Sequence, residues 1–202
     1  MINKKVYIEA GANNGITQSR TLHLKDNPEY MGILVEPHLE AYERCVQSRS
    51  SSDTIVINSA LVPLDYSHEF INLYGRAGHG ASNSGSLMAT VEDSPWKETD
   101  PTRFTDVPIA KVRAITLEKL LDNLKVEEVD YFFLDVEGYE REVLRGVTSR
   151  IRINNLEVEQ HDLNNLEKEK EELIIICSTL NLELVSTQTT DGHPKLNFKR
   201  SI

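Results

Sequence analysis

A chain of 202 residues is long enough to bury one substantial core and short for two, so we expect a single domain over residues 1–202. Hydrophobic residues make up 39% of the chain and charged residues 27%, a globular composition that excludes a disordered or fibrous protein. The net charge of -10, from 32 acidic and 22 basic side chains, repels phosphate backbones and argues against a nucleic-acid partner.

The cysteines and the hydropathy of the chain bear on its compartment. Cys45 and Cys177 each lie in a segment with helical periodicity and have no CxxC or histidine spacing that would hold zinc, so we interpret both as reduced core thiols. The chain runs from its first residues directly into a strand-like segment, and no apolar stretch approaches the roughly 18 residues of a membrane span. We therefore expect a cytoplasmic protein without a membrane partner.

Strand-like and helical patterns alternate over the first sixty residues. Short apolar runs predict strands at 6–10, 32–35 and 54–61. Helical periodicity between them predicts helices at about 16–25 and 38–48.

Residues 65–108 are less regular, because glycines and prolines interrupt them throughout. We expect edge strands there and a long loop-rich insertion, of the kind that often contributes to a binding site. Regular patterns return beyond it. They predict helices starting at Thr116 and over 139–147 and 163–180, and strands over 129–134, 156–158, 182–188 and 195–199.

This alternation predicts an α/β fold in which helices cover both faces of a mostly parallel sheet. The turn signal Asp191-Gly192 joins the last two strands as an antiparallel hairpin. Ligands bind such sheets at the carboxyl ends of the strands, near the point where the strand order reverses. We therefore expect the site on the loops that follow Ala10, Val35, Leu61, Leu134 and Val158.

The first of these loops carries an acid followed by two glycines four residues apart. Glu9 ends the strand, and Gly11 and Gly15 let the backbone turn and approach a ligand closely. The spacing is not the GxGxxG of a dinucleotide site, and an acid there would repel a pyrophosphate. It can attract the ammonium of a methionine moiety, which favours an aminoacyl-nucleoside ligand.

Glu36 ends the second strand, 25 residues after Gly11, where a carboxylate can accept both hydrogen bonds from a ribose diol. The alternative is that Glu36 is a solvated turn residue.

Three blocks of sequence resemble the FkbM-type methyltransferases. They are IEAGANNG at 8–15, ILVEP at 33–37, and ITLEKLL at 115–121 with VDYFFLDVEGYE at 129–140 and VLRG at 143–146. The resemblance implies a Rossmann-like class I methyltransferase fold with a seven-stranded sheet, S-adenosylmethionine as methyl donor, and O-methylation of a sugar or other small metabolite. The residues expected to bind the methyl donor are Glu9, Gly11, Asn13, Asn14, Gly15, Glu36, Pro37, Ser59, Ala60 and Asp135.

Methyl transfer to a hydroxyl needs alignment and removal of a proton. His161 follows the strand at 156–158, and its imidazole titrates in the useful range, so it is a candidate general base; capping a helix or binding the substrate are equally open roles. Asp135 and Glu137 end the preceding strand and are the other catalytic candidates. Together with Glu159 or His161 they can hold Mg²⁺, although we prefer that one orients the methyl donor and the other caps a helix, and we assign no metal.

The insertion offers candidate contacts to the acceptor. His79, Ser82 and Ser84 lie in a stretch dense in imidazole, hydroxyl and amide groups, and Trp96 can stack on a sugar face. A solvent-exposed linker and a packing role for Trp96 are the alternatives.

Two other functions compete with a methyltransferase. One is a nicotinamide-dependent oxidoreductase, which Glu9 and the missing GxGxxG disfavour. The other is a non-catalytic member that binds the methyl donor, or a protein partner through the acidic helix at 163–180.

Overall fold

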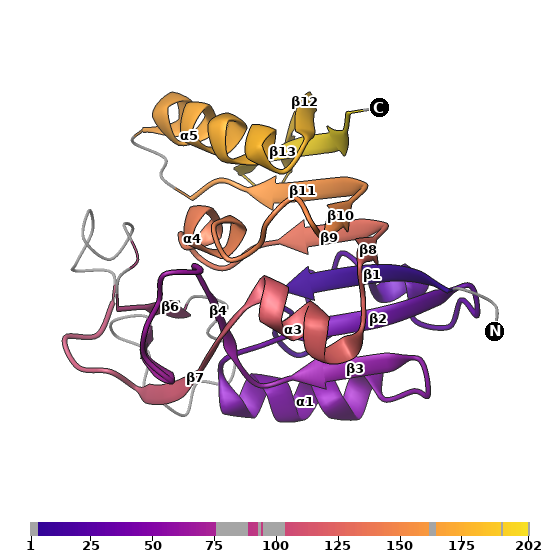
Figure 1. The fold of residues 1–202 in the computed structure, drawn as a ribbon. Helices are drawn as coiled ribbons and strands as arrows, with labels where there is room; N and C mark the ends of the chain where they lie inside the picture. Colours follow the sequence, from indigo (N-terminus) through magenta and orange to yellow (C-terminus); the bar gives the residue numbers. More distant parts are fainter. Residues whose placement is uncertain are drawn as a thin grey trace.

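The computed structural model describes residues 4–75, 89–92, 94, 104–161, 165–190 and 192–201. A seven-stranded sheet with the order β12-β13-β11-β9-β1-β2-β3 forms its centre (Figure 1). The strands are β1 (Lys5–Ala10), β2 (Tyr30–Val35), β3 (Thr54–Ile57), β9 (Tyr131–Leu134), β11 (Asn155–Glu159), β12 (Leu182–Thr190) and β13 (His193–Arg200). Strands β11, β9, β1, β2 and β3 run parallel, and β13 pairs antiparallel with β11 and β12. The predicted mostly parallel sheet with an antiparallel hairpin is confirmed.

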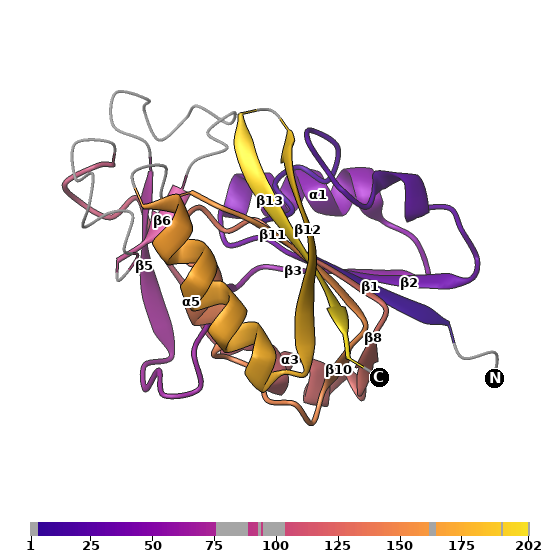
Figure 2. The same cartoon turned by 90° about the horizontal axis from the view of Figure 1, so that it is seen from above.

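Alternating side chains of each strand face opposite sides of this sheet. In β1, Val6 and Ile8 belong to the larger core, whereas Tyr7 packs with Cys45 of the smaller one. Helix α1 (Leu39–Arg49) covers the Tyr7 side. Helices α3 (Leu117–Leu124), α4 (Glu140–Leu144) and α5 (Leu166–Thr179) cover the other side, and Figure 2 shows α3 and α5 on the side of the sheet away from α1. Helices on both faces are thus confirmed, and both cysteines are buried in them.

A second sheet has the order β4-β7-β5-β6 and lies toward the carboxyl ends of the parallel strands (Figure 1). Its strands are β4 (Ala60–Val62), β5 (Phe70–Gly75), β6 (Ala89–Val91) and β7 (Ala110–Thr116). The strand predicted over 54–61 is therefore divided between the two sheets. Asn58 separates the halves, because its side-chain amide donates to the carbonyls of Glu36 and Pro37, each at 2.9 Å, and fixes the chain beside the end of β2.

The helix predicted over about 16–25 is wrong. The segment contains turns and one 3₁₀-helix, η1 (Leu22–Leu24), and Gln18 has a left-handed φ of 57°. Tertiary contacts outweigh the helical periodicity here, because the buried carboxylate of Glu9 accepts hydrogen bonds from the Arg20 backbone N–H and the Ser19 and Thr21 hydroxyls. Groups that an α-helix would point in different directions converge on one side chain.

Helix α3 begins at the predicted cap. The Thr116 hydroxyl accepts a hydrogen bond from the Lys119 backbone N–H at 3.1 Å. We expect Thr116→Ala to lower the free energy of unfolding by about 1 kcal/mol, because this N–H loses its partner. Urea denaturation followed by circular dichroism measures the loss. Thr116→Ser keeps the hydroxyl and should retain most of the stability; equal losses in both variants would show that the methyl group, not the cap, matters.

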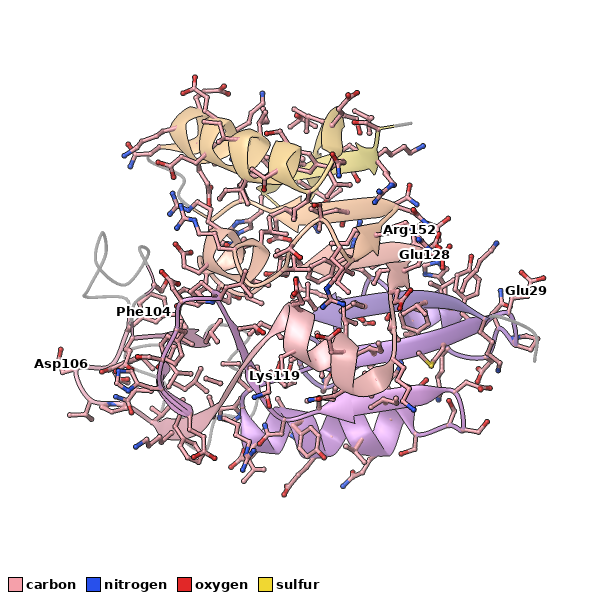
Figure 3. The ribbon with its side chains drawn as sticks, viewed as in Figure 1. Glu29, Phe104, Asp106, Lys119, Glu128 and Arg152 are labelled. Atoms are coloured by element: carbon pink, nitrogen blue, oxygen red, sulfur yellow. The ribbon has the colours of Figure 1, made fainter. Side chains whose placement is uncertain are left out.

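A short parallel pair, β8 (Glu128–Val129) and β10 (Arg152–Ile153), lies at the opposite end of the strands from the second sheet (Figure 1). Arg152 and Glu128 form an exposed ion pair there at 2.7 Å (Figure 3). In the part of the chain described, no helix has the length and apolarity needed to cross a membrane.

Candidate functional site

A cleft opens at the carboxyl ends of the parallel strands, where the chain leaves β1 for β2 on one side and returns as β9 on the other. Its cavity volume is about 110 Å³. One water molecule needs only about 10–15 Å³ by the same measure, so the cleft has room for a larger ligand. The ends of β1, β2, β9 and β11 and the start of β4 line it, as expected for a site on these loops.

Gly11 allows the loop after β1 to pass close to the loop after β9. It has a φ of +82°, and a Cβ atom there would lie 1.7 Å from the carbonyl oxygen of Asp135. The backbone N–H groups of Gly11 and Ala12 both donate to the Val35 carbonyl at the end of β2. The loop is thus held between the ends of two strands on the wall of the cleft.

Glu9 lies at the base of this loop and is only 5% exposed. Its carboxylate accepts the three hydrogen bonds that hold residues 19–21, and the Arg49 guanidinium lies 3.9 Å away. Glu9 lines the cleft, but these contacts occupy both of its oxygens. The attraction of a methionine ammonium that we expected of Glu9 remains a prediction, because both oxygens of Glu9 already accept hydrogen bonds from the protein.

Asn14 and Gly15 lie outside the lining of the cleft. The Asn14 side-chain oxygen accepts hydrogen bonds from the backbone N–H groups of Ile16 and Thr17. Arg49, which is fully buried, donates to the Gly15 carbonyl and to the Thr21 hydroxyl and carbonyl. Both residues shape the loop from the side that faces α1.

Glu36 reaches the cleft from the end of β2 and is 7% exposed. One carboxylate oxygen accepts from the Asn13 backbone N–H and the other from the His38 backbone N–H, both at 2.8 Å. Burial raises the pKa of Glu36 to about 7 against the lowering effect of these two N–H groups, and the negative charge of Asp135 adds to the rise. Each oxygen keeps a lone pair for a further donor.

The loop after β9 has a left-handed backbone at two successive residues. Gly138 adopts a φ of 93° and Glu137, which has a side chain, a φ of 57°. This uncommon conformation is held by Glu140, whose carboxylate accepts from the backbone N–H groups of Val136 and Gly138, and by the Thr90 hydroxyl, which donates to the Glu137 carbonyl. The loop directs Asp135 and Glu137 to the cleft.

Glu137 is close to other acids. Burial raises its pKa to about 8; the charge on His161 opposes the rise, and Asp135, Glu140 and Glu159 add to it. Neither Asp135 nor Glu137 caps α4 (Glu140–Leu144), whose first turn has no side-chain cap; Glu140 instead accepts hydrogen bonds from the loop before the helix.

His161 lies beneath the cleft and is not part of its lining. Its side chain is 2% exposed, with Nδ1 3.1 Å from Glu140 Oε1 and Nε2 3.3 Å from Asp135 Oδ1. Burial acts to lower the pKa of His161, but the charge and hydrogen bonds of Glu140 and Asp135 raise it well above its usual range. The structure therefore places His161 behind the carboxylates that reach the cleft.

The cleft brings together most of the side chains that the sequence suggested. Those that line it are Glu9, Gly11, Asn13, Glu36, Pro37, Ser59, Ala60, Asp135 and Glu137. The expected acceptor contacts His79, Ser82, Ser84 and Trp96 lie outside the described residues. From the insertion, Leu73 of β5 and Thr90 and Val91 of β6 do line the cleft.

Several polar residues of the lining were not predicted from the sequence, and three of them make contacts that shape the cleft. Arg20 pairs with Glu157 at 2.8 Å, Thr90 holds the Glu137 loop, and Lys195 pairs with Glu159 at 3.1 Å. The sequence could have indicated part of the role of Lys195, because strand alternation places Lys195 on the opposite face of the strand from Leu196 and Phe198. Its contact with Glu159 depends on the register of β13 against β11, which periodicity does not specify.

Comparison with known proteins gives a family match. The model of the family described as "Methyltransferase FkbM domain" matches residues 9–184. The fold is similar to that of the methyltransferase FkbM from Methylobacillus flagellatus KT, with 12% identity and a TM-score of 0.53, over 97% of this chain and 43% of that chain. This chain thus spans less than half of that protein.

A second similar structure is the ribosomal protein L11 methylase from Lactobacillus delbrueckii subsp. bulgaricus. It has 9% identity and a TM-score of 0.51, over 100% of this chain and 73% of that chain. These two likenesses show the fold that the sequence blocks implied. No curated protein sequence matches the chain.

Proposed function

Because this chain belongs to the FkbM family of S-adenosylmethionine-dependent methyltransferases, we propose that it transfers a methyl group to a hydroxyl of a sugar or other small metabolite. The observation that carries the proposal is the cleft itself. It combines a carboxylate suited to a ribose, Glu36, with two carboxylates, Asp135 and Glu137, on a loop packed against Gly11.

The methyl donor binds with its ribose on Glu36. Both oxygens of this carboxylate already accept one backbone N–H, and the second lone pair on each suits the two hydroxyls of a ribose diol. Asn13, Pro37, Ser59 and Ala60 surround the same part of the cleft. The methionine end extends past Gly11 toward Asp135, which places the sulfonium near the loop after β9.

The acceptor hydroxyl approaches from the side of Asp135 and Glu137. Its oxygen attacks the methyl carbon, the carbon–sulfur bond breaks, and S-adenosylhomocysteine leaves with the bonding electrons. The hydroxyl proton must leave as the oxygen–carbon bond forms, and we assign its removal to Glu137, which lines the cleft and whose pKa burial raises to about 8. His161, which is buried behind this loop, positions the carboxylates rather than touching the acceptor.

The polar lining beyond these acids supports a hydroxylated acceptor. Arg20, Glu157, Glu159 and Lys195 supply charged hydrogen-bonding groups on one side of the cleft. Sugars present many hydroxyls that both donate and accept, and such groups satisfy them well. Leu73 and Val91 add apolar side chains to the lining, suited to the carbon face of a ring.

The test is a screen of hydroxylated sugars and metabolites with S-adenosylmethionine labelled in the methyl group. We expect S-adenosylhomocysteine release to depend on one acceptor class, with the label recovered as an O-methyl ether by mass spectrometry. Label recovered on nitrogen, carbon or sulfur would contradict O-methylation, although the protein would still be a methyltransferase. Tight NAD binding with no S-adenosylmethionine binding would restore the oxidoreductase alternative.

A further inference from the structure

Two histidines and a carboxylate converge at the base of the cleft, and we propose that they form a binding site for one divalent transition-metal ion. This metal cluster is Glu159, His161 and His193, whose ligand atoms all lie within 4.8 Å of one another. Asp135 and Glu137 lie beside it on the loop after β9, where they approach His161. His193 is the residue that links this site to β13, and the methyl-transfer reaction described above does not use it.

The distances in and beside the metal cluster suit ligands arranged around an ion better than direct hydrogen bonds. His161 Nε2 lies 3.3 Å from Asp135 Oδ1, 3.6 Å from Glu137 Oε2 and 3.9 Å from Glu159 Oε1. A short charge-assisted hydrogen bond measures about 2.7–2.9 Å, so these longer separations show His161 Nε2 facing three carboxylates at once. Ligand atoms bound at about 2.1 Å to one ion are separated by about 3–4 Å.

One buried atom of the metal cluster, His193 Nδ1, lacks a hydrogen-bond partner among the residues that the structure describes. Polar atoms withdrawn from water without a partner are costly, so a native structure retains them where something else binds them. Glu159 Oε1 lies 3.9 Å from His193 Nδ1, which places this orphaned nitrogen on the same side as the other ligands.

Neighbouring charges orient two of the ligands. Glu140 Oε1, itself fixed by two backbone N–H groups, lies 3.1 Å from His161 Nδ1. A carboxylate at Nδ1 keeps the proton there and turns Nε2 toward the carboxylates, as is usual for histidines that bind metals. Lys195 Nζ lies 3.1 Å from Glu159 Oε2, which leaves Oε1 facing the two imidazoles.

The ligand types indicate which ion fits. Imidazole nitrogens favour zinc, iron, nickel and copper, carboxylates favour manganese and magnesium, and a mixed set suits Mn²⁺, Fe²⁺ or Zn²⁺. Mg²⁺ prefers all-oxygen ligands and fits poorly. An ion here would lie beside Asp135 and Glu137 and lower the pKa of a coordinated hydroxyl; that consequence rests on the proposed function, whereas binding of the ion does not.

The test is a Mn²⁺ titration of the full chain after dialysis against a chelator, with neither methyl donor nor acceptor present. Free Mn²⁺ is followed by electron paramagnetic resonance. We expect one equivalent of Mn²⁺ to bind per chain. An excess of Mg²⁺ over Mn²⁺ should not displace the bound Mn²⁺. His193→Ala changes a partly exposed side chain and should weaken Mn²⁺ binding by at least about tenfold.

Glu128→Gln, at the opposite end of the strands, is the matched control and should bind Mn²⁺ like the wild type (Figure 3). Far-UV circular dichroism verifies that each variant is folded, and His193→Gln replaces His193→Ala if the latter is not. The proposal is overturned if the wild type binds no Mn²⁺, if Mg²⁺ displaces it equally, or if the folded His193 variant binds as tightly. Because no methyl donor is present, failure here leaves the proposed methyl transfer standing.

Discussion

Glu36→Gln should weaken the binding of S-adenosylmethionine by about 10- to 100-fold at pH 8. The ionised carboxylate can accept two ribose hydroxyls, and each hydrogen bond to a charged group contributes about 1.5–3 kcal/mol. Glutamine has nearly the same shape but offers one acceptor oxygen, and no charge. Its oxygen can still accept one of the two backbone N–H groups that Glu36 now holds, from Asn13 or His38. Isothermal titration calorimetry measures the change.

The same contact predicts that the affinity for the methyl donor depends on pH. The pKa of Glu36 in the free protein is raised to about 7, so below this pH the side chain is mainly protonated and one oxygen becomes a donor. Ribose hydroxyls stabilise the ionised form, so binding at low pH must also release a proton. Affinity should therefore rise as pH increases through 7 and level off above it, by about tenfold between pH 6 and pH 8.

Two variants separate this effect from general changes in the protein. Glu36→Gln has no carboxylate, so its affinity should be flat over the same pH range. Glu43→Gln alters an exposed acid on α1 and should keep the pH dependence of the wild type. If Glu36→Gln bound S-adenosylmethionine as tightly as the wild type, the ribose would have to lie elsewhere in the cleft.

The elements that could be predicted from the sequence are those whose signal is local. Strands β1, β2 and β9 are short apolar runs bounded by turn residues, and Thr116 caps α3 through a hydroxyl three residues from its partner. Glu36 was predictable for the same reason, because a polar residue that ends a parallel strand must lie at the ligand-binding edge of the sheet.

What could not be predicted depends on contacts distant in the sequence. The helix expected over 16–25 fails because Glu9 and Arg49, from β1 and α1, hold that segment by side-chain contacts. His193 and Lys195 joined the site through the pairing of β13 with β11, which no pattern within either strand fixes. The position of His161 after β11 was predicted, but its burial follows from four surrounding carboxylates contributed by three segments.

The carboxylates of the cleft divide into two groups with different tasks. Glu9 and Glu140 are 5% and 1% exposed, and their oxygens are used by backbone N–H groups and hydroxyls of the protein. Asp135 and Glu137 are held by the loop conformation that those contacts create, and both side chains line the cleft. Of these four acids, we therefore consider Asp135 and Glu137 as candidates for the general base that accepts the proton of the acceptor hydroxyl.

Glu137→Gln should lower kcat by about 10²- to 10⁴-fold once an acceptor is known, which is the usual contribution of a general base. The affinity for S-adenosylmethionine should change by less than about twofold, because the lost interaction exists only in the transition state. Glutamine preserves the size of the side chain at a residue whose backbone has a φ of 57°, so the loop should keep its shape. Steady-state measurement of S-adenosylhomocysteine formation gives kcat, and pre-steady-state measurement gives the rate constant of methyl transfer without the contribution of product release.

His161→Gln, measured in the same experiment, tests the competing assignment of His161 as the general base. If His161 positions the carboxylates, this variant should lose less activity than Glu137→Gln, and Glu137→Asp should recover part of the rate because it restores a carboxylate near the acceptor. A loss below about fivefold in Glu137→Gln, together with a loss above about 10²-fold in a folded His161→Gln, would instead make the imidazole the base. Reaching the acceptor would then require His161, now 2% exposed beneath Asp135 and Glu137, to move into the cleft during turnover.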